Sequence, residues 1–102
     1  QERLKLAQEE VKYCQRALQK GHLGFDALVP AYQHLLKAEL ELAAKKVDRI
    51  AAYERSIKVM EQSVQHTRIL YESGSVTLSD YLKAQYLLID VKIDLEREKA
   101  HK

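Results

Sequence analysis

The chain has 102 residues, which is enough for one domain at most, and the helix breakers Gly (3) and Pro (1) are scarce in it. Its 17 basic and 15 acidic residues are interspersed, which excludes the clustered basic face of a nucleic-acid-binding protein. The single cysteine, Cys14, excludes an internal disulfide, and no run of about 18 apolar residues could span a membrane. We therefore expect an all-α fold.

The first predicted helix covers about residues 2–20. Apolar residues recur along it at the spacing of one helix face, namely Leu4, Ala7, Val11, Cys14 and Leu18. Gly21 follows, and glycine at this position commonly ends a helix in the left-handed conformation. Pro30 lies a few residues inside the next helical stretch, where it predicts a delayed or kinked start.

A long central helix is predicted next. No Gly or Pro occurs between residues 31 and 73, and an apolar stripe runs through the whole segment. A helix of about 45 residues is roughly 65–70 Å long at 1.5 Å per residue. The two turns then lie at opposite ends of the molecule.

The second turn carries clear signals for ending one helix and starting another. Gly74 predicts the left-handed helix end, and Thr77 with Asp80 is the pair that caps a new helix. Val76 and Tyr81 flank this cap as a hydrophobic staple. The last predicted helix covers about residues 78–100.

The two halves of the chain repeat each other at an offset of 53 residues, with repeat 1 at about 2–49 and repeat 2 at about 55–102. Identical residues at this offset include Lys5/Lys58, Val11/Val64, Gly21/Gly74, Ala31/Ala84, Leu35/Leu88, Leu42/Leu95 and Lys46/Lys99. A period near 50 residues built from one helical hairpin is typical of repeat and coiled-coil scaffolds. Helical pattern reaches both chain ends, so we expect a single helical-hairpin repeat domain, 1–102, from a longer protein.

The predicted architecture is a set of elongated antiparallel coiled-coil hairpins, with three helices and the long one in the centre. The first and last helices fold back along opposite halves of the central helix, so the cross-section contains two helices. Two helices cannot cover an apolar stripe of this width. We therefore expect a homodimer with a four-helix cross-section, most simply an antiparallel two-fold dimer.

Catalytic, cofactor and metal sites are not indicated. The four histidines, His22, His34, His66 and His101, have no Cys or carboxylate partner at a ligand-like spacing. Cys14 has no His one turn away, which favours a buried core residue over a nucleophile. The tyrosines are interpreted as seam residues between helices; they are Tyr13, Tyr32, Tyr53, Tyr71, Tyr81 and Tyr86. We expect no enzyme activity; the alternative is a helical bundle that binds a small ligand or a metal between helices through Tyr and His side chains.

Residues 74–91, GSVTLSDYLKAQYLLIDV, resemble the helix-turn-helix signature of TolC-type outer-membrane efflux proteins. That signature has a Gly turn, Ser or Thr, Asp, Leu, an Ala-Gln pair and a long heptad-like helix. In that family the turns are the periplasmic tips of a coiled-coil tunnel and dock onto hairpins of a periplasmic adaptor protein. The resemblance implies a bacterial periplasmic or cell-envelope location, an adaptor-type partner and partner-contact tips, here Gly21, His22, Leu23, Gly74, Ser75, Val76 and Thr77.

The arrangement of the tips is expected to differ from that family. There both tips share one end, whereas the uninterrupted helical pattern here predicts tips at opposite ends. No segment alternates in the manner of a barrel strand, so we expect the chain not to be a channel itself. The sequence favours a non-catalytic structural and protein-interaction module with its hairpin tips as contact points.

Overall fold

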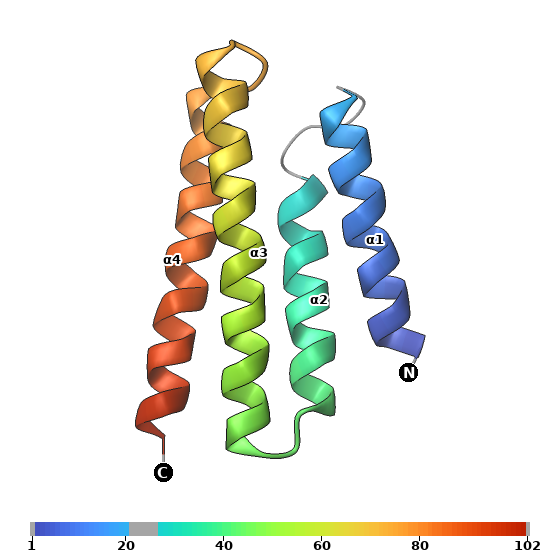
Figure 1. Ribbon diagram of the computed structural model, residues 1–102, viewed down its shortest axis with the longest axis vertical. Coiled ribbons are helices and arrows are strands. Elements are labelled where there is room, and N and C mark those ends of the chain that lie inside the picture. Colours follow the sequence, from blue (N-terminus) through green and yellow to red (C-terminus); the bar gives the residue numbers. More distant parts are fainter. Residues whose placement is uncertain (1, 21–26, 102) are drawn as a thin grey trace.

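The computed structural model describes residues 2–20 and 27–101 and contains four helices there (Figure 1). They are α1 (Glu2–Gln19), α2 (Leu28–Leu42), α3 (Lys46–Glu72) and α4 (Leu78–Ala100). No strand occurs among these described residues, so the all-α prediction is confirmed. The prediction of three helices is wrong, because the central one is two helices.

The helices lie side by side in chain order, each antiparallel to its neighbour (Figure 1). The pairs α1–α2 and α3–α4 form two hairpins, and α2 against α3 joins them. The Cα atoms extend over 45 × 29 × 15 Å, so the arrangement is a thin layer with α1 and α4 at its outer edges. The predicted rod of roughly 65–70 Å is therefore wrong, since the longest dimension is 45 Å.

The predicted central helix is interrupted at residues 43–45. Ala43 has φ −90° and ψ 94°, and Lys45 has φ −101° and ψ 151°, both extended conformations. Neither Gly nor Pro marks this interruption, and Lys45 makes no side-chain cap. The reason is tertiary: folding back allows the apolar face of α2 to be buried against α1 and α3, which stabilises more than one continuous helix would.

Two basic side chains at the start of α3 hold this linker. The Arg49 guanidinium donates to the Ala44 carbonyl at 3.2 Å and to Glu98 Oε1 on α4 at 2.8 Å. Lys46 Nζ donates to the carbonyls of Lys99 and His101, at the end of α4. Because the last carbonyls of a helix lack intrahelical partners, these bonds satisfy α4 while fixing where α3 begins.

The interruption decides which helix ends lie together. The end of α1 and the start of α2 lie at the same end as the α3–α4 turn, and both chain termini lie at the other (Figure 1). The prediction of turns at opposite ends is therefore wrong. That prediction depended on a continuous helix through residues 43–45. Because the chain reverses direction there, α3 runs back alongside α2 toward the end where α2 began.

The core lies between the hairpins and within each of them. It is formed by Val11, Cys14, Leu18, Leu28, Ala31, Tyr32, Leu36, Met60, Ala84, Leu87 and Val91. At the 53-residue offset the structure buries both members of four pairs, namely Ala7/Met60, Cys14/Thr67, Ala31/Ala84 and Ala38/Val91. The two hairpins thus use equivalent positions for their internal contacts.

The start of α2 follows from Pro30. Helix α2 begins at Leu28, so Pro30 lies in its first turn. The backbone N–H groups of the first turn have no partner within the helix, so the N–H that proline lacks costs no hydrogen bond there. The equivalent helix α4 begins at Leu78, which corresponds by the repeat to residue 25. Residues 21–26 lie outside the described part of the chain, so the predicted delay stays a prediction.

Substituting Lys46→Pro tests the interruption directly. Residue 46 is the first residue of α3 and Lys45 is already extended, so proline fits there, whereas inside a continuous helix it costs about 3 kcal/mol. We expect Lys46→Pro to match Lys46→Ala, which removes the same Nζ bonds, within about 0.5 kcal/mol in urea denaturation. A Lys46→Pro variant that is less stable than Lys46→Ala by the full helix-interior cost would show that the helix is continuous.

Candidate functional site

The α3–α4 turn, residues 73–77, has a defined backbone geometry. Gly74 adopts φ 79°, and its N–H donates to the Tyr71 carbonyl at 3.0 Å, while the Ser75 N–H donates to the Leu70 carbonyl at 2.7 Å. These two bonds form a Schellman motif, which ends α3 and satisfies its last carbonyls. The Ser73 hydroxyl adds a bond to the Leu70 carbonyl at 3.0 Å.

The start of α4 is fixed by a capping box. The Asp80 N–H donates to Thr77 Oγ1 at 3.1 Å, and the Thr77 N–H donates to Asp80 Oδ2 at 3.3 Å. This confirms the pairing predicted from the sequence. A cap of this kind contributes about 1 kcal/mol, so the turn is fixed on both sides by bonds that require no partner protein.

The residues between these two motifs are open to solvent. Gly74, Ser75 and Thr77 are exposed, and Val76 is half-buried. Beneath them the rings of Tyr71 and Tyr81 stack, with centroids 5.7 Å apart and an interplanar angle of 17°. The turn therefore presents a small, preorganised surface on an aromatic support.

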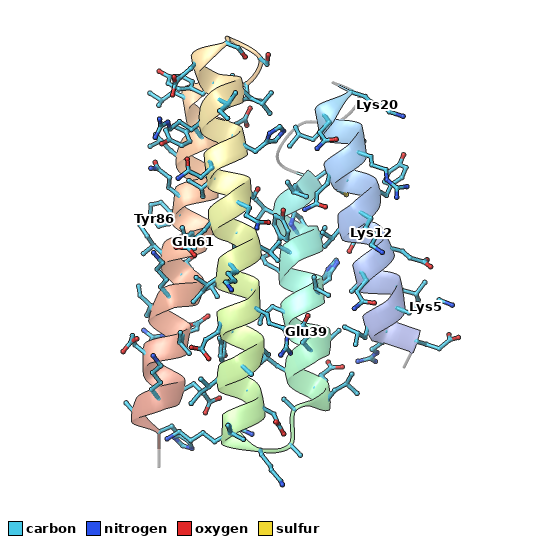
Figure 2. All side chains as sticks on the ribbon, in the orientation of Figure 1. Lys5, Lys12, Lys20, Glu39, Glu61 and Tyr86 are labelled. Atoms are coloured by element: carbon cyan, nitrogen blue, oxygen red, sulfur yellow. The ribbon has the colours of Figure 1, made fainter. Side chains whose placement is uncertain are left out.

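The first predicted tip lies in a different situation. Gly21, His22 and Leu23 fall outside the residues that the structure describes. Lys20, at the end of α1, and the start of α2 lie at the same end as the α3–α4 turn (Figures 1 and 2). Of the seven predicted contact residues the structure thus describes only Gly74, Ser75, Val76 and Thr77, and the role of all seven in binding stays a prediction.

The remaining candidate side chains are dispersed. His34 Nδ1 lies 2.9 Å from Glu10 Oε1 on the exposed side of α1–α2, His101 follows α4, and His22 lies outside the described residues. His66 lines a groove between α1, α2 and α3, far along the chain from both. No cluster of three or more His, Cys, Asp or Glu side chains able to hold a metal ion occurs within residues 2–20 and 27–101.

That groove is one place where the helices could receive a small molecule. It has a volume of about 300 Å³ and is lined by Leu18, Leu28 and Val59 together with polar side chains, including Gln15, Tyr32 and His66. Gln15 Nε2 donates to the Tyr32 hydroxyl at 2.9 Å. His66 Nε2 is buried and has no hydrogen-bond partner among the described residues.

The tyrosines only partly follow the seam interpretation. Tyr32 is buried, and burial together with the nearby charges of Asp94 and Glu98 raises the pKa of Tyr53. Tyr13 and Tyr86 are 67% and 71% exposed on the outer helices, so they do not lie in a seam within the chain, and a seam with another copy stays a prediction. The helical period places them on an apolar face, but the chain supplies no helix to cover that face.

Cys14 is a core residue, as its position predicted. Its side chain is buried, and Sγ lies 3.7 Å from the Ala27 carbonyl. Burial, with a smaller contribution from the charge of Glu10, raises the pKa of the Cys14 thiol. Both effects keep the thiol protonated and unreactive.

We therefore expect Cys14 to react with a thiol reagent slowly in the folded chain and rapidly in denaturant. The folded pKa of the Cys14 thiol lies above its ordinary value of 9.0. The contribution of this group to stability is therefore fully present below pH 9.0 and is lost as the pH rises through the folded pKa. The wild type should lose stability relative to Cys14→Ala over that range. Equal labelling rates in folded and unfolded chains would contradict a buried thiol.

Two functional features were missed by sequence reasoning. One is the pair Lys46 and Arg49, which anchors the linker to α4; a basic side chain near a helix start gives no signal of a partner about 50 residues away. The other is which apolar face of the last helix stays uncovered: on α4 it is the face of Leu82, Tyr86 and Ile89. Its heptad-like spacing was visible, but the sequence could not say which face lacked a neighbour.

Comparisons with known proteins identified no similar protein. No family model, no curated protein and no solved structure matches this chain. Among the described residues, none of the helices is both long and apolar enough to cross a lipid bilayer.

Proposed function

We propose that this chain is a non-catalytic structural and protein-interaction module of a bacterial cell envelope. Its two antiparallel hairpins act as short coiled coils, and the end that carries both turns contacts an adaptor-type periplasmic protein. The contact residues are those of the tips, Gly21, His22, Leu23, Gly74, Ser75, Val76 and Thr77. The module also associates with further copies of itself.

One observation carries this proposal. The described tip, residues 73–77, is held by a Schellman motif and a capping box while its side chains remain exposed or half-buried. A surface that is ordered before binding loses little conformational entropy on binding, which favours recognition by a partner. The end of α1 and the start of α2 lie at the same end as the α3–α4 turn (Figure 1). The TolC-type resemblance implies that the hairpin ends share one docking end, and this arrangement of the helix ends supports the proposal.

Val76→Asp is the test, with Val47→Asp as its matched control. Val47 is exposed at the start of α3, at the opposite end of the layer, so both variants place the same charge on a surface valine. Circular dichroism should show unchanged helix content for both. We expect wild type and Val47→Asp to retain a specific protein from bacterial envelope extract and Val76→Asp to lose it.

Two results would contradict the proposal. Retention of the same protein by Val76→Asp would place the contact elsewhere on the layer. Failure of the wild type to retain any protein that distinguishes the two variants would remove the basis for a docking end.

A second candidate function is the binding of a small ligand between helices, favoured by the groove beside His66. An unpartnered buried ring nitrogen costs free energy, and a ligand that hydrogen-bonds to it would recover that cost. A library of small aromatic compounds and divalent metals should then contain a member that raises the melting temperature of the wild type but not of His66→Leu. A screen with no such member would exclude this function.

A further inference from the structure

We infer that copies of this chain associate head to tail, with the outer face of α4 in one copy packed against the outer face of α1 in the next. The inference rests on the proposed function in one respect, namely that the module associates with further copies of itself. It reuses the contact between α2 and α3, which joins the two hairpins within each chain.

The outer face of α4 is apolar and uncovered. Leu78, Leu82, Tyr86, Ile89 and Ile93 are all substantially exposed, although they recur at three- and four-residue spacing along one helix. Figure 2 shows Tyr86 at this edge of the layer, with Lys5 at the opposite edge on α1. A continuous apolar stripe of this kind marks an interaction surface, and its spacing is that of a helix seam.

The internal repeat identifies what this stripe is built to contact. Leu82, Ile89 and Ile93 correspond, at the 53-residue offset, to Val29, Leu36 and Leu40 of α2. In α2 these three residues belong to the core or pack against it. The outer face of α4 is thus a copy of the face that α2 uses toward the second hairpin.

The outer face of α1 is the complementary copy. Leu6 and Tyr13 are 62% and 67% exposed there, and they correspond to Val59 and His66 of α3. Both α3 residues line the groove beside Leu28 and Tyr32 of α2. The exposed face of α1 therefore corresponds to the face of α3 that contacts α2. The exposed face of α4 corresponds to the face of α2 that contacts α3.

Charges on the two faces follow the same correspondence. Within the chain Arg55 Nη2 on α3 lies 3.3 Å from Glu39 Oε2 on α2. The equivalent positions are Glu2 on α1 and Lys92 on α4. The pair is again of opposite sign, with the charges exchanged, so the repeated contact places Lys92 of one copy beside Glu2 of the next.

The directions of the helices also agree. The α2 and α3 helices are antiparallel, and α1 and α4 run in opposite directions within one chain (Figure 1). Two copies in the same orientation therefore bring α4 and α1 together as another antiparallel pair. Such an interface uses two different faces, so it adds copies in one direction and gives a closed ring or a filament instead of a two-fold dimer.

Sedimentation velocity on Leu6→Asp and Ile89→Asp, separately and mixed, tests this inference. Both residues are exposed in the single chain, so neither variant removes a core side chain. We expect the wild type to form assemblies larger than one chain as its concentration rises, and each variant alone to remain a single chain. Ile69→Asp, which changes an exposed isoleucine on the inner helix α3, is the matched control and should assemble like the wild type.

The mixture gives the decisive result. Leu6→Asp retains a normal α4 face and Ile89→Asp retains a normal α1 face, so an equimolar mixture should form a species of two chains and nothing larger. A two-fold interface between α4 faces would let Leu6→Asp associate by itself. This outcome, a mixture that stays unassociated, or a wild type that stays a single chain at every concentration would overturn the inference.

A charge exchange supplies a second test that leaves the apolar faces intact. Glu2→Lys alone and Lys92→Glu alone should each weaken association by about tenfold, because like charges then meet, and the double variant should restore it. No recovery in the double variant would overturn the pairing. Val76→Asp should assemble normally, so loss of tip binding and loss of self-association can be told apart.

Discussion

Replacing Tyr32 with alanine is expected to lower the free energy of unfolding by about 3–5 kcal/mol, the range for removing a buried aromatic side chain. Tyr32 is only 3% exposed and belongs to the core cluster. Its ring lies beside Leu18 of α1 and Val59 of α3 in the groove between the hairpins. Since a domain of this size has a stability of about 5–15 kcal/mol, much of the folded population would be lost. Urea denaturation followed by circular dichroism measures the change.

Tyr32→Phe separates the ring from its hydroxyl. It retains the packing and removes only the acceptor of the 2.9 Å bond from Gln15 Nε2, so we expect a loss of about 1 kcal/mol. If Tyr32→Ala were no more destabilising than Tyr32→Phe, packing of the ring between the two hairpins would not stabilise the fold. The folding back of α2 would then lack its main support.

The second large effect is expected at Met60. This side chain is 2% exposed and is among the largest that are fully buried, on the face of α3 that belongs to the core cluster. Met60→Ala leaves a cavity in the second hairpin and should cost about 2–5 kcal/mol. The melting temperature and the denaturation midpoint should both fall.

Met60→Leu is the control, because it nearly conserves volume and should cost less than about 1.5 kcal/mol. The residue equivalent to Met60 in the first repeat is Ala7, which is also buried. Because alanine is small, Ala7→Gly removes much less volume at the matching place in α1. Equal losses for Met60→Ala and Met60→Leu would contradict a cavity as the cause.

The α3–α4 tip was predictable in detail because its determinants are local. Gly74 is the residue that tolerates φ 79°, and Thr77 with Asp80 caps a helix whatever surrounds it. These interactions join residues at most five positions apart, so they can be predicted from the order of the amino acids. The first tip could be predicted on the same grounds, and its residues lie outside the described part of the chain.

The arrangement of the tips was not predictable in this way. Residues 43–45 consist of good helix formers, and a local reading continues the helix through them. The gain from interrupting it comes from distant partners: Tyr32 and Leu36 are buried in a core shared with α3 and α4, and Arg49 joins the Ala44 carbonyl to Glu98. A difference of a few kcal/mol in tertiary packing outweighs the propensity of three residues.

The sequence by itself determined that the chain is helical, where its capped turn lies, and which residues form the apolar faces of the helices, since each depends on residue type and short spacing. The tertiary structure alone decided that residues 2–20 and 27–101 form four helices and that α1 ends and α2 begins at the end that carries the α3–α4 turn. It also decided that Tyr13 and Tyr86 remain uncovered. Periodicity shows that a face is apolar, but only the packing of the other helices shows whether it has a neighbour.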